Sequence, residues 1–225
     1  MNIILCEGKR DAWFFHEIMK DHIDFNCILC MPDSGMSKLQ ELLGSSCFNY
    51  IKTQYSLLIY GDNGKPIIIE KVLQRVVVDT LGKVKDDINV VLILDDDGIN
   101  YNDLYKTIFD KLQSIVRDKS KFNPLPYFEE NNNLLILKHP KGRGCITIKL
   151  TTVPTSLEDQ IANKIVEVKC PHNSKILENG AEKALKYLRK EYYESYEEMI
   201  RQSSTWFKGE NWVDNIPTFC LLNSS

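Results

Sequence analysis

The sequence predicts an α/β fold: a mostly parallel sheet flanked by helices, with a helical C-terminal extension. Three observations lead to this prediction. Residues 90–94 (VVLIL) run directly into Asp95, Asp96 and Asp97, which is the pattern of a buried strand that ends in a polar turn. Strand-like and helix-like patterns alternate over residues 1–120, and a long amphipathic stretch covers residues 181–202.

The composition indicates one large domain, or one domain with an extension. The chain has 225 residues, of which 43% are hydrophobic, and a net charge of −3. This charge gives no general basic footprint, so a nucleic acid would need a local basic patch or a bridging metal. The first ten residues (MNIILCEGKR) become charged too early for a signal peptide, and no apolar run approaches the roughly 20 residues that span a bilayer. The lack of a spanning run predicts no membrane association. The seven cysteines are an odd number, which, without a secretory signal, indicates a reducing cytoplasm.

The first strand and helix place an acidic residue at a tight turn. Residues 2–6 form an apolar strand, Glu7 and Gly8 close it, and residues 9–20 have helical spacing. Asp11 lies in the first turn of that helix. An acidic residue there complements the helix dipole, which is one explanation for Asp11. The other explanation is a role in a functional site.

Further strands and helices follow in alternation. Residues 67–80 give a helical stripe, but their β-branched content leaves a strand as an alternative. A turn is expected at residues 131–133. The remaining elements expected from apolar periodicity are strands at 24–31, 56–60, 134–137 and 145–150, and helices at 37–43, 101–119, 154–168 and 181–202.

Two features of the second half bear on partners. The loop at residues 138–144 (KHPKGRG) is compact, basic and rich in glycine; it either contacts a phosphate backbone or is a solvated hairpin loop. Four aromatic residues near the C-terminus need burial, on the core or on a second copy of the chain: Trp206, Phe207, Trp212 and Phe219. A homodimer through the C-terminal helix and this aromatic tail is therefore considered.

The carboxylates at two strand ends form the candidate site. If the first strand and the strand at residues 90–94 are neighbours, Glu7, Asp95 and Asp97 converge, because residues i and i+2 of an extended segment point the same way. Asp96 then points elsewhere or contributes at the turn. Carboxylates in this arrangement suit Mg²⁺ or Mn²⁺, and crowding would raise the pKa of Glu7 towards that of a general acid or base. The basic residues expected to contact phosphate are Lys9, Arg10, Lys141 and Arg143.

The motif Glu7-Gly8-x-x-Asp11 after one apolar strand, with Asp95-x-Asp97 after a later one, resembles the Toprim domain. This domain occurs in type IA and type II topoisomerases, bacterial-type primases, OLD-family nucleases and small stand-alone proteins. The turn at residues 34–38 and the helix start at residues 156–159 are similar to further Toprim segments. The resemblance covers roughly residues 1–120. It implies a Rossmann-like, metal-dependent fold in which the glutamate is an acid/base and the two aspartates bind magnesium.

The resemblance also predicts how the chain is divided into domains. The two motifs are further apart than in the compact primase version, which implies an insertion around residues 50–85. The expected domains are a Toprim-like core at 1–170 and a helical extension at 171–225 packed on that core. The chain lacks a G-x-x-x-x-G-K-[ST] motif and a zinc ribbon, so a topoisomerase or a complete primase is disfavoured.

Three functions remain open from the sequence. The first is metal-dependent phosphodiester chemistry on DNA or RNA, as a nuclease or nucleotidyl transferase. The second is a non-catalytic module that binds nucleic acid or a nucleotide through a metal. The third is a structural protein with a vestigial site.

Overall fold

The computed structural model describes residues 1–22, 28–32, 35–43, 57–83, 86–140 and 144–222. They form one seven-stranded sheet in the order β2-β3-β1-β4-β7-β6-β5. The five strands from β2 to β7 pair in parallel, and β6 and β5 continue the sheet as an antiparallel hairpin. The strands are β1 (Asn2–Cys6), β2 (Ile28–Pro32), β3 (Leu57–Gly61), β4 (Ile88–Asp95), β5 (Tyr127–Asn131), β6 (Leu134–Lys138) and β7 (Cys145–Val153). The predicted α/β class with a mostly parallel sheet is confirmed.

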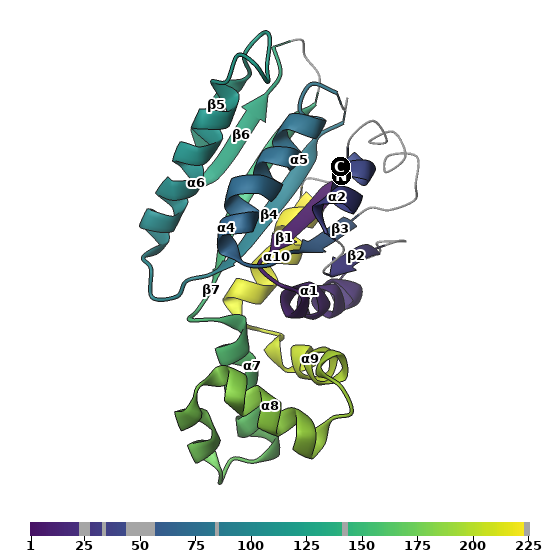
Figure 1. The fold of residues 1–225 in the computed structure, drawn as a ribbon, viewed down its shortest axis with the longest axis vertical. Helices are drawn as coiled ribbons and strands as arrows, with labels where there is room; N and C mark the ends of the chain where they lie inside the picture. The colour runs from purple at the N-terminus through teal and green to yellow at the C-terminus, as the bar shows by residue number, and fades with distance from the viewer. Residues whose placement is uncertain (23–27, 33–34, 44–56, 84–85, 141–143, 223–225) are drawn as a thin grey trace.

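Helices cover both faces of the sheet (Figure 1). The first face packs on α2 (Met36–Leu43), α4 (Lys65–Ile67), the π-helical turn η1 (Ile68–Val72), α5 (Leu73–Thr80) and α6 (Tyr101–Val116). The second packs on α1 (Lys9–His22) and α10 (Asn211–Leu222), and its apolar core continues into α7 (Leu157–Lys169), η2 (Ser174–Asn179), α8 (Ala181–Tyr192), α9 (Tyr196–Ser204) and η3 (Thr205–Phe207). Alternate residues of β4 enter the two cores: Val90 and Leu92 enter the first, Val91 and Ile93 the second. This explains the unbroken apolar run that predicted the strand.

The structure resolves the ambiguity at residues 67–80 in favour of a helix. Gly64 precedes Lys65 and Pro66 at the helix start, where proline is tolerated because its missing N–H would be unpaired anyway. The segment from β3 to α5 is integral to this sheet, because β3 pairs directly with β1. Whether residues 50–85 are an insertion relative to Toprim proteins stays a prediction.

The sequence prediction missed β5. Its residues (YFEEN) are mostly exposed and lack the apolar alternation of a strand. It forms because Asn132 and Asn133 both have positive φ angles, 49° and 61°, as a tight hairpin turn to β6 requires. The turn predicted at residues 131–133 is thus present.

The single helix predicted at residues 181–202 is wrong. Two helices, α8 and α9, are separated at Tyr193, Glu194 and Ser195. Oγ of Ser195 accepts a hydrogen bond from the N–H of Glu198, and Oε2 of Glu198 accepts one from the N–H of Glu194. This capping box starts a new helix in the middle of the amphipathic stripe.

The C-terminal elements return to the core of the same chain. Helices α7, α8 and α9 form a helical lobe beyond the carboxyl ends of the parallel strands, and α10 comes back to the sheet at β7 (Figure 1). Trp212 stacks on Phe14 of α1 with 5.9 Å between ring centroids, and Phe207 contacts the same ring edge-on. Two of the four tail aromatics, Phe207 and Phe219, are buried. The aromatic tail therefore packs on its own core, and a homodimer through it stays a prediction.

A search of the described helices finds none with the length and apolar character needed to cross a bilayer.

Candidate functional site

Glu7 and Asp95 meet at the carboxyl edge of the sheet. β1 and β4 are parallel neighbours, with Cys6 opposite Ile93. The residues that follow these positions therefore leave the sheet side by side. Oε1 of Glu7 accepts a hydrogen bond of 2.8 Å from the backbone N–H of Asp95. The structure thus brings together two of the three acids that the sequence selected.

Two further acids lie next to this pair. Oδ2 of Asp11 accepts a hydrogen bond of 2.6 Å from the N–H of Gly8, so Asp11 closes the turn after β1. Glu158, in the first turn of α7, pairs with Arg10 at 3.0 Å. Oδ1 of Asp95 accepts a hydrogen bond of 3.0 Å from the N–H of Leu157, which brings the start of α7 to the end of β4. We call Glu7, Asp11, Asp95 and Glu158 the carboxylate cluster.

Burial and mutual repulsion raise the pKa values of three members of this cluster, Asp95, Asp11 and Glu7. Desolvation, with the charge of Glu7 next in size, raises the pKa of Asp95 from 3.8 to about 7. Desolvation, followed by the charges of Glu158 and Asp95, raises the pKa of Asp11 well above its ordinary value. The pKa of Glu7 is also raised by desolvation, although the N–H of Asp95 and the charge of Lys65 oppose the shift. Carboxyl groups with such raised pKa values are typical of functional sites.

Lys65 supplies a positive charge at this edge, and the sequence analysis missed it. Its Nζ donates hydrogen bonds of 2.6 Å to the backbone oxygen of Asp95 and to Oδ2 of Asp97, and lies 3.7 Å from Oε1 of Glu7. The side chain is only 14% exposed. The available signal was the turn at residues 61–64, since it follows a parallel strand and therefore lies at the same edge.

Asp97 reaches this edge by a different route from the one predicted. The extended segment ends at Asp95, and Asp97 has a positive φ of 47°, so the rule that residues i and i+2 point alike does not apply. Its side chain is 55% exposed and contacts Lys65. The ammonium group of Lys65 thus links the carboxylate of Asp97 to the backbone oxygen of Asp95.

Asp96 has a structural role in the turn. Its Oδ1 accepts hydrogen bonds from the N–H of Gly98 at 3.1 Å and from that of Thr155 at 2.9 Å. These bonds fasten the turn after β4 to the turn after β7. Its carboxylate is therefore occupied by backbone donors, which agrees with the expectation that it contributes at the turn.

The carboxylate oxygens of the cluster are suitable ligands for a hard cation. In Asp11, Asp95 and Glu158, one carboxylate oxygen has a donor at 2.6–3.0 Å, and the other has none among the described residues. Such oxygens are the ligands that Mg²⁺ prefers. However, no three His, Cys, Asp or Glu side chains in the described part of the chain converge as a metal site. Binding of magnesium or manganese by Glu7, Asp95 and Asp97 stays a prediction.

The four predicted phosphate contacts have different surroundings. Lys9 is exposed, and its ammonium lies 4.9 Å from the centroid of the Trp13 ring. Arg10 is engaged by Glu158 and by the ring of Tyr196. Lys141 and Arg143 lie outside the described residues.

The described residues that flank the basic loop lie at the start of β7 and the end of β6. Cys145 begins β7, beside the start of β4, and its N–H donates to Asp87 at 2.8 Å. In the parallel register Ile88 faces Ile146 and Asp95 faces Val153. At about 3.3 Å per residue, the two ends of this register are roughly 23 Å apart. Lys138 and Cys145, which flank the loop, therefore lie at the opposite edge of the sheet from the carboxylate cluster.

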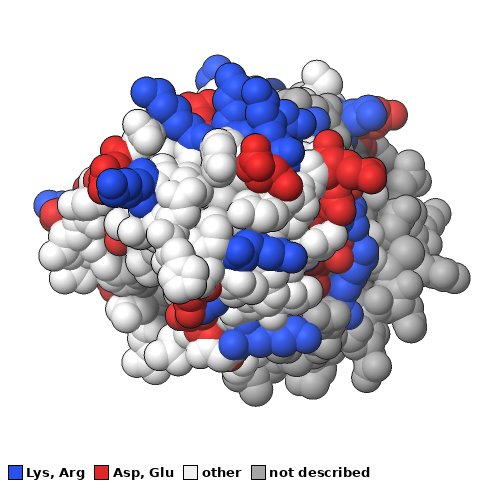
Figure 2. Space-filling view, turned by 90° about the horizontal axis from the view of Figure 1, so that it is seen from below, with Lys and Arg blue, Asp and Glu red and all other residues white. Residues whose placement is uncertain are grey.

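A cavity of about 460 Å³ opens beside the cluster. Asp11 and Glu158 line it, together with residues of the turn after β1, α1, the turn after β3 and α9: Gly8, Lys9, Arg10, Trp13, Asn63 and Tyr196. The helical lobe thus forms one wall of the candidate site. Seen from the side of that lobe, basic side chains gather along the upper edge of the view, and acidic and basic side chains are interspersed over the rest of the described surface (Figure 2).

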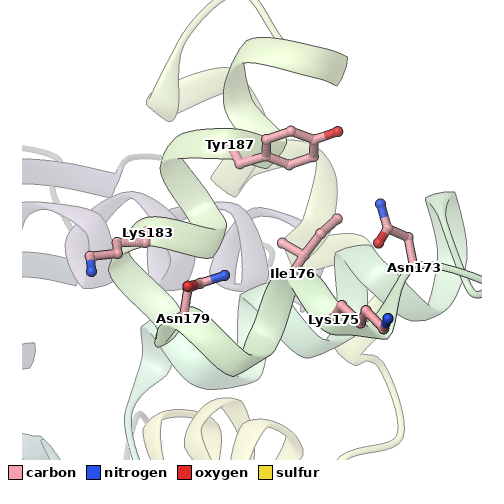
Figure 3. Close-up of a pocket in the computed structure, with 6 residues that line it drawn as sticks. All are labelled: Asn173, Lys175, Ile176, Asn179, Lys183 and Tyr187. Atoms are coloured by element: carbon pink, nitrogen blue, oxygen red, sulfur yellow. The ribbon is translucent and has the colours of Figure 1, made fainter.

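A second cavity, of about 370 Å³, lies on the helical lobe between η2 and α8 (Figure 3). It shares no residue with the carboxylate cluster and has no acidic side chain in its lining: Asn173, Lys175, Ile176, Asn179, Lys183 and Tyr187.

Gly61 fixes the spacing of the two turns that carry Glu7 and Lys65. A Cβ atom at Gly61 would lie 2.3 Å from the backbone oxygen of Gly8, and the N–H of Gly64 donates to the backbone oxygen of Glu7 at 2.7 Å. We expect Gly61→Ala to destabilise the protein by about 1–3 kcal/mol, because one backbone must move away from the other. Chemical denaturation measures this change. A free energy of unfolding equal to that of the parent would contradict the close approach.

The residue Ser34 of the predicted turn at residues 34–38 lies outside the described residues, whereas Ser156 caps α7 by accepting the N–H of Asp159 at 3.1 Å.

No family model, curated protein or solved structure matches the chain.

Proposed function

We propose that this protein performs metal-dependent phosphodiester chemistry on nucleic acid, as a nuclease or nucleotidyl transferase of the Toprim type. The observation that carries the proposal is the hydrogen bond between Glu7 and Asp95. The backbone N–H of Asp95 donates it to the Glu7 carboxylate where the neighbouring strands β1 and β4 end. Both residues have raised pKa values. The order of the Glu7 and Asp95-x-Asp97 motifs, each of which follows an apolar strand, supports the same assignment.

In this proposal each side chain has a distinct task. Glu7, whose pKa is raised, transfers a proton to or from the reacting oxygen, as a group with a pKa near the working pH does best. Asp95 and Asp97 hold magnesium or manganese. When bound, the ion supplies charge neutralisation at the phosphate and orients the attacking oxygen.

Lys65 favours an alternative function. Its ammonium already neutralises part of the negative charge around Glu7 and Asp97. A site balanced in this way suits a module that binds nucleic acid or a nucleotide, through a metal or through Lys65 itself, without cleaving it. The two functions differ in whether a product forms.

A cleavage assay tests the proposal. Labelled single-stranded DNA, duplex DNA and RNA are incubated with Mg²⁺, with Mn²⁺ or with EDTA. We expect cleavage that depends on the metal and falls at least about 100-fold in Glu7→Gln and Asp95→Asn. The matched control is Asp110→Asn, on the exposed surface of α6, which should cleave like the parent.

The other outcomes assign the alternatives. Metal-dependent binding with no product after long incubation supports the binding module. Cleavage by both variants at the parental rate rejects the enzyme proposal, and the absence of cleavage, binding and metal stabilisation leaves the structural alternative.

A further inference from the structure

The cavity beside the carboxylate cluster has an aromatic wall that the proposed chemistry does not use. Trp13 of α1 and Tyr196 of α9 both line it and are both partly buried. Its volume of about 460 Å³ lies within the range of small-ligand sites, about 300–1,000 Å³. The chain therefore places a flat apolar surface directly next to its carboxylates.

The two aromatic rings are held differently. Tyr196 has two guanidinium groups over its ring, with Arg10 at 4.9 Å and Arg189 at 5.4 Å from the ring centroid. Arg10 is fixed in turn by Glu158. Tyr196 is therefore a rigid wall whose ring is already engaged. Trp13 has the ammonium of the exposed Lys9 over its ring, and a lysine on a long flexible stem can move aside for a ligand.

We propose that this cavity binds one unpaired nucleobase of a single-stranded nucleic acid by stacking on Trp13. This inference rests on the proposed function, because it takes nucleic acid as the substrate, and it names the form of that substrate. Every base has a π-face, so stacking on an aromatic side chain tolerates any sequence. Lys9, displaced from the ring, then pairs with a phosphate of the same strand.

The position of the cavity explains why the base must be unpaired. Asp11 and Glu158 belong both to the cavity lining and to the carboxylate cluster, so a base on Trp13 has its phosphate next to the cluster that also contains Glu7 and Asp95. A base inside a duplex is stacked on both faces and cannot enter a cavity without leaving the helix. Asn63, which lines the cavity from the turn after β3, offers both a donor and an acceptor to the edge of the base.

Binding measurements without cleavage test this inference. Fluorescein-labelled oligothymidine, oligouridine and a blunt DNA duplex of equal length are titrated with the full chain in Ca²⁺ and again in EDTA, and anisotropy is recorded. We expect a single strand to bind at least about 10-fold more tightly than the duplex, with Trp13→Ala removing that preference and Trp13→Phe retaining most of it. The two single-stranded probes distinguish DNA from RNA as the source of the base.

Trp206→Ala is the matched control. Trp206 is also partly buried and has a lysine over its ring, Lys169 at 6.0 Å, but it does not line the cavity. It should leave single-strand affinity unchanged, and thermal melting checks that each variant folds. Equal affinity for duplex and single strand, no binding of any probe, or a Trp13→Ala variant that binds like the parent overturns the inference. Metal-dependent cleavage alongside any of these results leaves the proposed function intact, whereas Trp13-dependent binding without cleavage supports the inference and removes the chemistry.

Discussion

Asp95→Asn should melt at a higher temperature than the parent protein at pH 8 and at nearly the same temperature at pH 4. In the parent, burial and the neighbouring Glu7 raise the pKa of Asp95 from 3.8 to about 7. At pH 8 the folded protein must therefore keep a carboxylate ionised in a place that disfavours the charge. Asparagine has the same shape and no charge, and its Oδ1 still accepts the hydrogen bond that Leu157 donates.

The direction of the pH dependence follows from proton binding. Between about pH 4 and pH 7 the folded state retains a proton on Asp95 that the unfolded state has lost. The free energy of unfolding of the parent therefore falls as the pH rises through this interval. Asparagine does not titrate, so the part of this decrease in unfolding free energy that comes from residue 95 is absent in the variant. The raised pKa values of Glu7 and Asp11 still make the stability of the variant fall as the pH rises.

The expected gain at pH 8 is about 1–2 kcal/mol after allowance for solvent screening, or about 3–6 °C in melting temperature. Calorimetry at pH 4, 6 and 8 measures it, with the exposed Asp110→Asn as the control. A variant that gains stability while losing activity has the pattern of a functional site selected against stability. A loss of stability at pH 8 would show instead that the Asp95 carboxylate supports the fold.

The meeting of Glu7 and Asp95 was predictable because it depends on only two features. Each acid directly follows a short apolar run, and the carboxyl ends of parallel strands share one edge of the sheet. Only the adjacency of β1 and β4 had to be assumed, and the register of Cys6 with Ile93 supplies it. The contact therefore follows from local pattern plus topology.

Lys65 and Glu158 were not predictable in the same way. The β-branched residues after Pro66 left a strand as an alternative to the predicted helix, so the direction of Lys65 was undefined. Glu158 has an ordinary explanation as an acid in the first turn of α7, where Ser156 and Asp159 make the cap. Only the tertiary structure shows that Glu158 faces Arg10 and shares a cavity with Asp11.

The predicted role of the basic loop illustrates what a motif list leaves out. Its composition suits phosphate, but Lys138 and Cys145 are paired at the closed end of the β6–β7 hairpin. Because β7 runs parallel to β4, that end lies at the amino edge of β4 and away from Asp95. Strand direction decides which basic residues can reach the site, and direction is set by pairing rather than by composition.

Lys65→Met should destabilise the protein in EDTA and should increase its stabilisation by Mg²⁺ or Mn²⁺. The variant keeps the length of the side chain and removes the ammonium that contacts Asp97 and the backbone oxygen of Asp95 and lies near Glu7. Removing one partner from a largely buried charge cluster leaves the others uncompensated. We expect a loss of about 2–3 kcal/mol without metal, or roughly 5–10 °C in melting temperature.

The response to metal distinguishes the roles of Lys65. If the carboxylates accept a divalent ion, the ion replaces the lost positive charge, and the variant gains more than the parent from it. Binding at 100 times the dissociation constant contributes about 2.7 kcal/mol, which is enough to restore the parental melting temperature. If Lys65 is only a structural cation, metal leaves the variant destabilised.

Thermal melting in EDTA, Mg²⁺ and Mn²⁺ separates these results, with Lys71→Met as the matched control. Lys71 follows in the same helical run and is exposed, so its replacement removes one positive charge without touching the cluster and should shift neither the stability nor the metal response. A Lys65→Met variant that melts like the parent in EDTA contradicts the balance of charge described for this edge of the sheet. A destabilised variant that no divalent ion rescues retains that balance but rejects a metal site among Glu7, Asp95 and Asp97, because these carboxylates are then most in need of a cation and still do not bind one.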